Sequence, residues 1–431
     1  MKRKSRTFYI SSINGNDAND GLSANTPFLT LNKINEIEIC AGDKILLEKG
    51  SEFSGEYLHL KNCGDINGEI IEIASYGDGD MPIIKADGTG VWYQDYGTPL
   101  DSNCHIYKGD VSSAILLFDC ENIIIKDIEI TNKDSEKSLE EYSNPNKTDR
   151  TGVAVVAQNR GTLHNITLDN LYIHDVNGNV YNKHMNNGGI YMTCFKPDDE
   201  EKTGVARYDG VTVKNCYVKK VSRWGIAVGY SYKHKEFATK ELSADTFKKY
   251  GHENILICGN YVKFAGGDAI TPMYALEPLV EHNVADSCAC EMNDRIYSKP
   301  EKRMGKVAAA IWPWKCKNAL LRYNEAVDTK LNQDGMAYDA DSGDGTVYEK
   351  NYSRLNEGGC IMFCLQEAIH NIFKDNVSYD DLGGTVSAVG NPDAYIANNK
   401  FYVRKGVPFR RKKMRSGKIT LKNNEIITIE K

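Results

Sequence analysis

Apolar and polar positions alternate in short runs along this chain, and one kind of run recurs with an asparagine or aspartate inside it. Examples are ILICGNYV around Asn260, TVYEKNYS around Asn351 and NIFKDNVS around Asn376. Alternation with a period of two predicts a short β-strand on each side of the polar residue. The pattern is centred on Asp127, Asn170, Asn215, Asn260, Asn283, Asn324, Asn351, Asn376, Asn399 and Asn424.

The spacing of this pattern predicts the fold. Intervals of 23 to 27 residues dominate the C-terminal half, and most earlier copies are separated by 41 to 45 residues. A repeat of about 23 residues built from short strands is typical of a parallel β-solenoid, with one coil per repeat. We therefore expect an all-β parallel β-helix in which asparagines at one turn of neighbouring coils hydrogen-bond one another. A β-sandwich is the alternative, but its strands would not keep one register over so many repeats.

The whole chain, residues 1–431, is predicted to form one β-helix domain. Residues 1–110 are expected to hold an N-terminal cap and the first coils, and residues 111–431 the regular coils with loop insertions. In the cap, Thr26 is a candidate helix N-cap, and Pro27 would be the first helical residue. We expect a short helix after Thr26, with an apolar stripe of Phe28, Leu31, Ile34 and Ile37.

Long polar insertions interrupt the repeat at several places, and they predict a groove. If they leave the coils at the same turn, they form a wall along one side of the solenoid. The basic run RRKKMR at 410–415 falls in the last of these loops. We interpret it as a solvated loop rather than a partner-binding patch.

Composition and charge narrow the range of possible partners and locations. A net charge of −6 argues against a nucleic-acid partner. No apolar run reaches the length of a transmembrane helix or a signal peptide, so no membrane partner is expected. We expect a cytoplasmic protein, or a secreted one if a signal was removed. The twelve scattered cysteines are interpreted as reduced core thiols. The sequence leaves open whether a partner chain or a second copy of this chain completes the site.

Acidic residues concentrate between Asn332 and Gly359. In the predicted strand MAYDAD, Asp339 and Asp341 share one face and Tyr338 belongs to the other. A buried, unpaired carboxylate costs several kcal/mol. The face that carries the two aspartates should therefore meet water, a cation or a substrate.

Two pairs of residues connect this stretch with its neighbouring coils. Asp334 and Glu357 lie 23 residues apart, each just before a glycine, so their backbones should stack at about one strand spacing. That spacing is close to the roughly 5–5.5 Å between the carboxyls of a retaining glycosidase. Trp312 and Trp314 lie 27 residues before Asp339 and Asp341. Indole rings beside carboxylates are typical of a sugar-binding groove. The candidate substrate-binding residues are Asp339, Trp312, Trp314, Tyr338 and Trp224.

Three segments of the chain resemble right-handed parallel β-helix glycoside hydrolases, the group that holds β-xylosidases and lacto-N-biosidases. They are GNDANDGLSANTPFLTL near the N-terminus, AGDKILLEKG, and the stretch from DGMAYDAD to NYSRLNEGG. The resemblance implies two acidic residues that act as nucleophile and general acid/base. The β-xylosidase-like pattern, an Asp and a Glu one coil apart, matches Asp334 and Glu357. The lacto-N-biosidase-like pattern, two Asp seven residues apart, matches Asp334 and Asp341. Because seven extended residues span roughly 20 Å, we expect the first pair unless Gly335 bends the chain.

Other interpretations of the acidic stretch remain open. Clustered aspartate oxygens suit Ca²⁺, so a structural calcium site is one of them; no other cofactor is expected. A Ca²⁺-dependent polysaccharide lyase would need a basic residue, and Lys315 and Arg354 are the only neighbours in the sequence. A non-catalytic glycan-binding β-helix would keep the aromatic residues without reactive carboxylates. Our prediction is a glycoside hydrolase of the retaining type that acts on an oligosaccharide.

Overall fold

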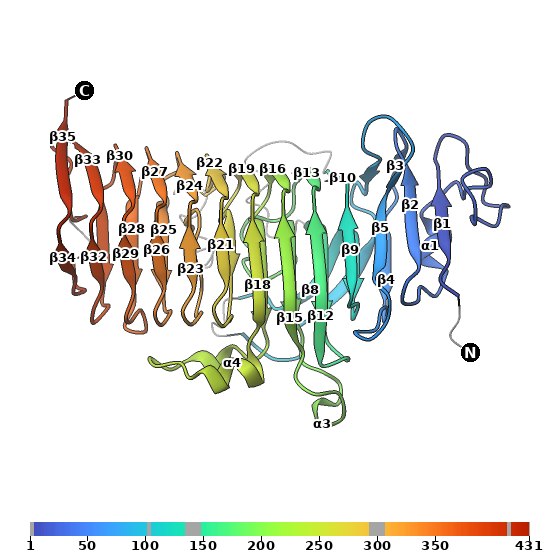
Figure 1. Cartoon of the computed structure of the whole chain (residues 1–431), viewed down its shortest axis with the longest axis horizontal. Helices are drawn as coiled ribbons and strands as arrows, with labels where there is room; N and C mark the ends of the chain where they lie inside the picture. Colours follow the sequence, from blue (N-terminus) through green and yellow to red (C-terminus); the bar gives the residue numbers. More distant parts are fainter. Residues whose placement is uncertain (1–3, 101–104, 134–147, 293–306, 412–414, 431) are drawn as a thin grey trace.

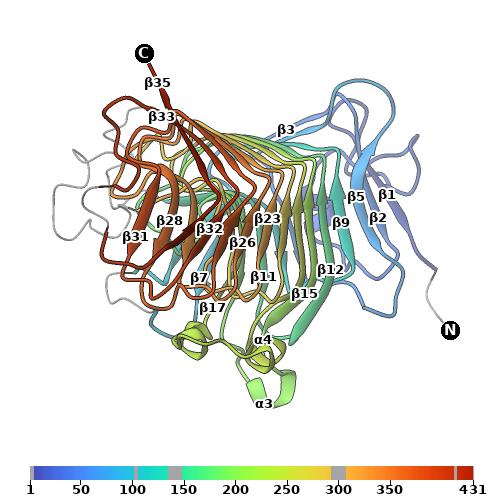
Figure 2. The same cartoon turned by 60° about the vertical axis from the view of Figure 1, so that its left-hand side comes forward.

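The chain folds into a right-handed parallel β-helix with a short helix in its N-terminal cap. The computed structural model describes residues 4–100, 105–133, 148–292, 307–411 and 415–430. Two sheets run from the N-terminal to the C-terminal end of the molecule (Figure 1). Figure 2 shows the coils stacked behind one another, with β28 and β31 beside β26 and β32. The predicted fold class is therefore confirmed.

The first sheet has 13 strands, and all of its pairings are parallel. Its order is β1 (Thr7–Ile10), β2 (Lys44–Glu48), β5 (Ile71–Tyr76), β9 (Ile123–Lys126), β12 (Thr162–Asp169), β15 (Arg207–Lys214), β18 (Glu253–Cys258), β21 (Leu279–Glu281), β23 (Leu320–Arg322), β26 (Val347–Glu349), β29 (Ile372–Lys374), β32 (Tyr395–Ala397) and β34 (Thr420–Lys422).

The second sheet has 12 strands. In each coil its strand follows the strand of the first sheet after a short turn. Its order is β3 (Glu52–Ser54), β6 (Ile83–Lys85), β10 (Glu129–Asn132), β13 (Tyr172–Val176), β16 (Tyr217–Val221), β19 (Tyr261–Ala265), β22 (Val284–Asp286), β24 (Glu325–Val327), β27 (Tyr352–Arg354), β30 (Val377–Tyr379), β33 (Lys400–Arg404) and β35 (Glu425–Ile429).

The third face of the helix consists of two shorter sheets. One holds β4 (Leu58–Lys61), β8 (Lys108–Phe118), β11 (Asp149–Ala157), β14 (Gly188–Cys194), β17 (Trp224–Ser231) and β20 (Ile270–Pro272), with β7 (Val91–Asp95) antiparallel to β8. The other holds β25 (Met336–Asp341), β28 (Gly359–Cys364) and β31 (Val386–Val389). Residues 311–314 lie between β20 and β25 and are joined to them by single bridges. Pro313 has no N–H to give to a ladder, which accounts for the interruption.

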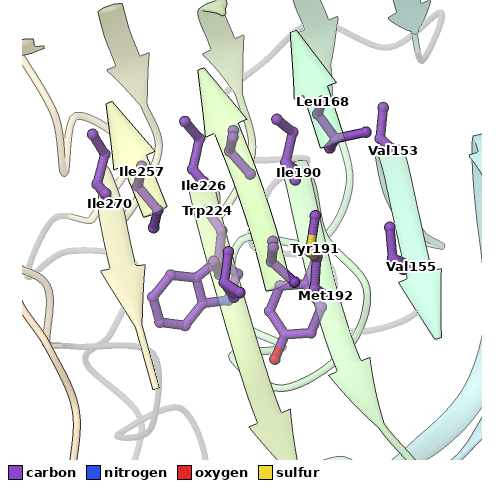
Figure 3. Packing of buried hydrophobic residues seen from close by; sticks show 14 of the residues in the cluster. Val153, Val155, Leu168, Ile190, Tyr191, Met192, Trp224, Ile226, Ile257 and Ile270 are labelled. Atoms are coloured by element: carbon purple, nitrogen blue, oxygen red, sulfur yellow. The ribbon is translucent and has the colours of Figure 1, made fainter. Parts of the chain in front are cut away.

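The interior of the β-helix is built from matched rows of apolar side chains. Val153, Ile190, Ile226 and Ile270 occupy paired positions of β11, β14, β17 and β20, and all four are fully buried (Figure 3). Burying one such side chain contributes about 1.5–3 kcal/mol. Because every coil adds residues to each row, the stack is stabilised along its whole length.

The asparagine ladder forms as predicted over the C-terminal coils. The side-chain amide of Asn260 donates to Oδ1 of Asn283 at 2.9 Å, and the same contact links each asparagine to the next. The ladder consists of Asn260, Asn283, Asn324, Asn351, Asn376, Asn399 and Asn424. Each amide also donates to a backbone carbonyl of an earlier coil, so polar groups at a buried bend are satisfied.

The three earlier members of the sequence pattern do not belong to this ladder. Asp127, Asn170 and Asn215 have positive φ and occupy the position just before it. The residue after Asn215, Cys216, takes the ladder place there, because its N–H donates to Oδ1 of Asn260 at 2.9 Å. Asn and Asp tolerate the left-handed conformation better than other residues with a Cβ. Asparagine and aspartate therefore mark this turn for two different reasons. The earlier residues adopt the left-handed conformation, and the later asparagines form the ladder.

The cap helix starts later than predicted. Helix α1 covers Asn32–Asn35, follows Leu31 and has no side-chain N-cap. Thr26 is not a cap, because its hydroxyl donates to Asp20 at 2.9 Å within the preceding loop. Of the predicted apolar stripe, Ile34 lies within the helix; Phe28 and Leu31 are buried before it, and Ile37 is half-buried after it.

The insertions that the structure describes carry the other helices. These are α3 (Glu200–Thr203), the 3₁₀ helix η1 (His234–Phe237) and α4 (Ala244–Tyr250). Helices α3 and α4 project from the same side of the stack (Figure 1). Most of the insertions at 132–150 and 290–306 fall outside the described residues. The cysteines within the described ranges other than Cys40 are free thiols, as predicted. None of the helices in that part of the chain combines the length and hydrophobicity needed to span a membrane.

Candidate active site

The acidic residues of β25 face outward between two coils that present apolar side chains. Asp341 pairs with Trp314 on one side and with Cys364 on the other. Asp339 pairs with Met362, and the bridges at 311 and 314 place Trp312 opposite it. The predicted shift of 27 residues between the tryptophans and the aspartates is therefore confirmed. Apolar neighbours on both sides bury Asp339 and leave Asp341 half-buried.

Tyr338 points to the other face of the same strand. Its hydroxyl donates to the backbone carbonyls of Asn324 at 3.0 Å and Tyr352 at 2.6 Å inside the helix. The alternation along MAYDAD is as predicted, but the proposed contact between Tyr338 and substrate is not supported. A fully buried phenol whose hydrogen bonds are satisfied by interior backbone groups serves the core.

Burial raises the pKa of all three aspartates, and the charge of Asp341 adds to it for Asp334 and Asp339. The pKa of Asp334 is raised to about 7 by burial first and by the charge of Asp341 next. The pKa of Asp339 is raised well above its ordinary value by burial, then by Asp341 and Asp334. Burial also raises the pKa of Asp341, but a hydrogen bond from the Ser342 hydroxyl at 2.7 Å opposes the shift. Of the three, Asp341 has the most support for its charged form.

Two cations that the sequence pattern did not identify lie at this site. The ammonium of Lys183 lies 5.5 Å from the ring centroids of Trp312 and of Trp314, and its charge lowers the pKa of Asp334 and of Asp341. The guanidinium of Arg411 donates to the backbone carbonyl of Asp334 at 3.0 Å. Lys183 belongs to a connection before β14, and nothing in its local sequence signals this position.

Arg411 corrects the interpretation of the basic run at 410–415. The side chain is partly buried against the acidic coil, and burial lowers its pKa while Asp334 raises it. It also approaches the carbonyl of Gly358 at 3.5 Å. Residues 412–414 of the run lie outside the described part of the chain. Arg411 is thus a structural support of the site and not part of a solvated loop.

The tryptophans are more enclosed than predicted. Trp312 is 4% and Trp314 8% exposed, whereas partial exposure was expected. The indole N–H of Trp312 donates to Asp268 at 2.9 Å, and Asp268 pairs with the fully buried Arg223 at 2.7 Å. Trp314 stacks on Tyr230 with ring centroids 5.6 Å apart. Both rings belong to a fixed wall beside the carboxyls, and only a small part of each is open to a ligand.

Trp224, the other candidate for substrate binding, is fully buried. Its indole N–H donates to the backbone carbonyl of Lys183 at 2.7 Å. Trp224 therefore positions the segment that carries Lys183 and does not contact a ligand in this conformation. The assignment of Trp224 to substrate binding is therefore not supported. Aromatic content alone does not show which way a ring points.

Glu357 stacks with Asp334 through the backbone but not through the carboxyl. Met336 pairs with Gly359, so the two acidic residues occupy equivalent positions of neighbouring coils. The Glu357 carboxylate, however, accepts the N–H of Leu331 at 2.7 Å and lies 3.6 Å from the ammonium of Lys330. The charge that acts most strongly on Asp334 is that of Asp341. The geometry therefore favours the Asp334–Asp341 pair over the Asp334–Glu357 pair.

A bend at Gly335 explains why Asp334 and Asp341 can be paired although they are seven residues apart. Gly335 has φ of +75°, a left-handed conformation that glycine adopts readily, and β25 begins only after it at Met336. Asp334 is therefore not part of the extended strand. The seven-residue spacing does not translate into a span of roughly 20 Å, because that distance assumes continuous extension.

The described residues hold no cluster of three or more His, Cys, Asp or Glu side chains arranged for a metal ion.

Comparison with known proteins identifies the family. No family model matches the chain. It is 41% identical over 436 residues to a lacto-N-biosidase of Bifidobacterium longum subsp. longum. It is also 58% identical to the crystallised GH136 lacto-N-biosidase of Eubacterium ramulus, with a TM-score of 0.95 over 98% of this chain and 68% of that chain. This chain belongs to the GH136 lacto-N-biosidase family.

Membership of the GH136 family agrees with the predicted resemblance and does not favour a polysaccharide lyase. The chain spans 27% of the length of the Bifidobacterium longum relative, while that alignment covers 92% of this chain. A more distant structure described as a glycoside hydrolase has 10% identity and a TM-score of 0.51, which shows the shared fold alone.

Proposed function

We propose that this β-helix hydrolyses a glycosidic bond of an oligosaccharide with retention of configuration, as a lacto-N-biosidase. Asp334 is the general acid/base and Asp341 the nucleophile. One observation carries the assignment: the pKa of Asp334 is raised to about 7 by burial and by the nearby charge of Asp341. Pairs of carboxyls whose environments separate their pKa values are typical of retaining glycosidases.

The surroundings of Asp341 suit a nucleophile. Its carboxylate accepts a hydrogen bond from the hydroxyl of Ser342, and the charges of Lys183 and Lys315 lower its pKa against the effect of burial. Attack of this carboxylate on the anomeric carbon breaks the bond to the leaving oxygen, which takes the proton of Asp334. The products of this step are a glycosyl ester on Asp341 and the free leaving alcohol.

The second step uses the same two residues in reverse roles. Asp334, now ionised, takes a proton from water, and the water oxygen attacks the anomeric carbon from the side that the leaving group vacated. The ester bond to Asp341 breaks, and Asp334 is protonated again. Because the ester is uncharged, the repulsion on Asp334 disappears during the intermediate and its pKa falls, which suits its role as a base.

The other residues of the site hold this pair in place. Arg411 fixes the backbone of Asp334, and Lys183 balances the charge of the acidic cluster. Trp312 and Trp314 supply the apolar wall against which a sugar ring lies. Substrate contacts of Trp312, Trp314 and Asp339 thus remain part of the proposal, whereas Trp224 and Tyr338 serve the protein interior.

Three nearly isosteric variants test the catalytic pair. We expect Asp334→Asn and Asp341→Asn each to lower kcat by at least 1,000-fold on a nitrophenyl lacto-N-bioside, because each removes a group that acts in every turnover. Glu357→Gln is the matched control and should keep most of the activity. Full activity of Asp341→Asn together with an inactive Glu357→Gln would reverse the assignment.

The stereochemistry and the alternatives are tested with the same proteins. NMR of the reaction at early times should show a product with the anomeric configuration of the substrate. Azide should restore turnover to Asp334→Asn when the leaving group is good. A nitrophenyl β-xyloside serves as the substrate control. Loss of activity on EDTA treatment, with an unsaturated product, would support the calcium-dependent lyase instead. Binding without any turnover by the wild type would support a non-catalytic glycan-binding protein.

A further inference from the structure

The Asp339 carboxyl lies in a more enclosed place than either carboxyl of the proposed catalytic pair. Asp339 is 4% exposed, between Trp312 on one coil and Met362 on the next. Its Oδ1 is fully enclosed and has no hydrogen-bond partner within the described residues. Its backbone is fixed, because the hydroxyl of Tyr348 donates to its carbonyl at 2.7 Å. A rigidly held, buried oxygen without a partner indicates a group that is completed by a ligand.

The charges around Asp339 oppose its ionisation. Asp341 and Asp334 on the same coil and Asp268 on an earlier coil all raise its pKa, and Lys183 lowers it. The neighbours on the flanking coils, Trp312, Met362 and Cys364, carry no charge that would stabilise an anion. Burial acts in the same direction and is the largest cause. Acidic groups around Asp339 therefore outnumber cationic ones, which favours its neutral form.

We propose that Asp339 is a specificity-determining residue that works as a neutral carboxylic acid and donates a hydrogen bond to an acceptor oxygen of the bound sugar. This inference rests on the proposed function and adds to it a role for a third carboxyl of the site. A neutral acid can donate and accept, whereas a carboxylate can only accept. With Asp334 protonated and Asp339 neutral, the site accepts an uncharged sugar beside a single carboxylate. A uronate would place a second negative charge there.

Two variants separate the hydrogen bond from the charge. Asp339→Asn keeps a donor and has no charge, so kcat/KM should stay within about fivefold of wild type and the pH profile should not move. Asp339→Leu has a similar volume without a donor, and kcat/KM should fall about 10- to 100-fold. Affinity for the disaccharide product, measured by calorimetry, should fall in the Leu variant and not in the Asn variant. Equal binding and turnover of the Leu variant would overturn the proposal.

The protonation state is measured without any reaction. The infrared difference spectrum between wild type and Asp339→Asn at pH 8 should contain the band of a protonated carboxyl, because the contribution of other buried acids such as Asp149 cancels in the difference. The melting temperature of Asp339→Asn should exceed that of wild type by a margin that is small near pH 4 and grows up to pH 8, because only the unfolded wild-type chain releases this proton. Absence of the band, or a shift of the activity profile of Asp339→Asn to lower pH, would show an ionised Asp339. The infrared and melting measurements can be made even if the wild type hydrolyses no glycoside. A failure of this proposal can therefore be distinguished from a failure of the proposed function.

Discussion

The replacement Asp334→Asn should stabilise the protein while it abolishes turnover. In the wild type, burial and Asp341 raise the pKa of Asp334 from 3.8 to about 7. Between about pH 4 and pH 7 the unfolded chain loses a proton that the folded chain keeps, so the folded state loses stability as pH rises through this window. Asparagine does not titrate and avoids this loss. The stabilisation should therefore be absent below pH 4 and complete above pH 7.

The size of the effect follows from the shift. A change of about 3 pKa units corresponds to about 4 kcal/mol at 1.36 kcal/mol per unit. This is an upper value, because part of Asp334 is open to water, which screens its charge. For a chain of 431 residues, an unfolding entropy of about 2.1 cal/mol/K per residue gives about 1 °C per kcal/mol. We expect the variant to melt up to about 4 °C above wild type at pH 8.

The assay compares wild type and Asp334→Asn by calorimetry or fluorescence at pH 4.5, 6 and 8. Glu357→Gln is the matched control, since its carboxylate lies with Lys330 and Leu331 outside the cluster. A gap between Asp334→Asn and wild type that does not change with pH, or lower stability of the variant at pH 8, would refute the reasoning. Wild-type activity should fall above about pH 7, where the general acid loses its proton.

Three further predictions concern residues around the pair. Lys183→Met should move the pH profile of activity to higher pH, since the ammonium lowers the pKa of Asp334 and of Asp341; an unmoved profile would show that Lys183 is screened. Trp312→Phe should raise KM and weaken product binding by roughly 1–3 kcal/mol, because the smaller ring, no longer held by Asp268, covers less of a bound sugar; unchanged affinity would remove Trp312 from the site. Asn351→Ala should lower the free energy of unfolding by about 2–4 kcal/mol in thermal or urea denaturation with kcat unchanged, since it interrupts the buried ladder to Asn324 and Asn376; a loss of kcat at equal stability would contradict a purely structural role.

Periodicity along the chain was sufficient to predict the fold and part of the site. A coil of 23 to 27 residues places equivalent positions side by side, so Trp314 and Asp341 could be matched from their separation alone. The alternation within MAYDAD likewise separated Tyr338 from Asp339, because side chains of a strand point to opposite faces. These inferences succeed since backbone register in a β-helix is a local, repetitive property.

Only the tertiary structure decided which carboxyls meet and what surrounds them. Glu357 stacks with Asp334 in the backbone, yet its side chain turns to Lys330, and no repeat length specifies a rotamer. Lys183 and Arg411 reach the acids from segments about 150 and 75 residues away along the chain. The pKa of Asp334 depends on burial by these distant segments and on the bend at Gly335, and both arise only when the coils are stacked. Desolvation and side-chain direction are properties of the folded assembly, which a one-dimensional pattern does not contain.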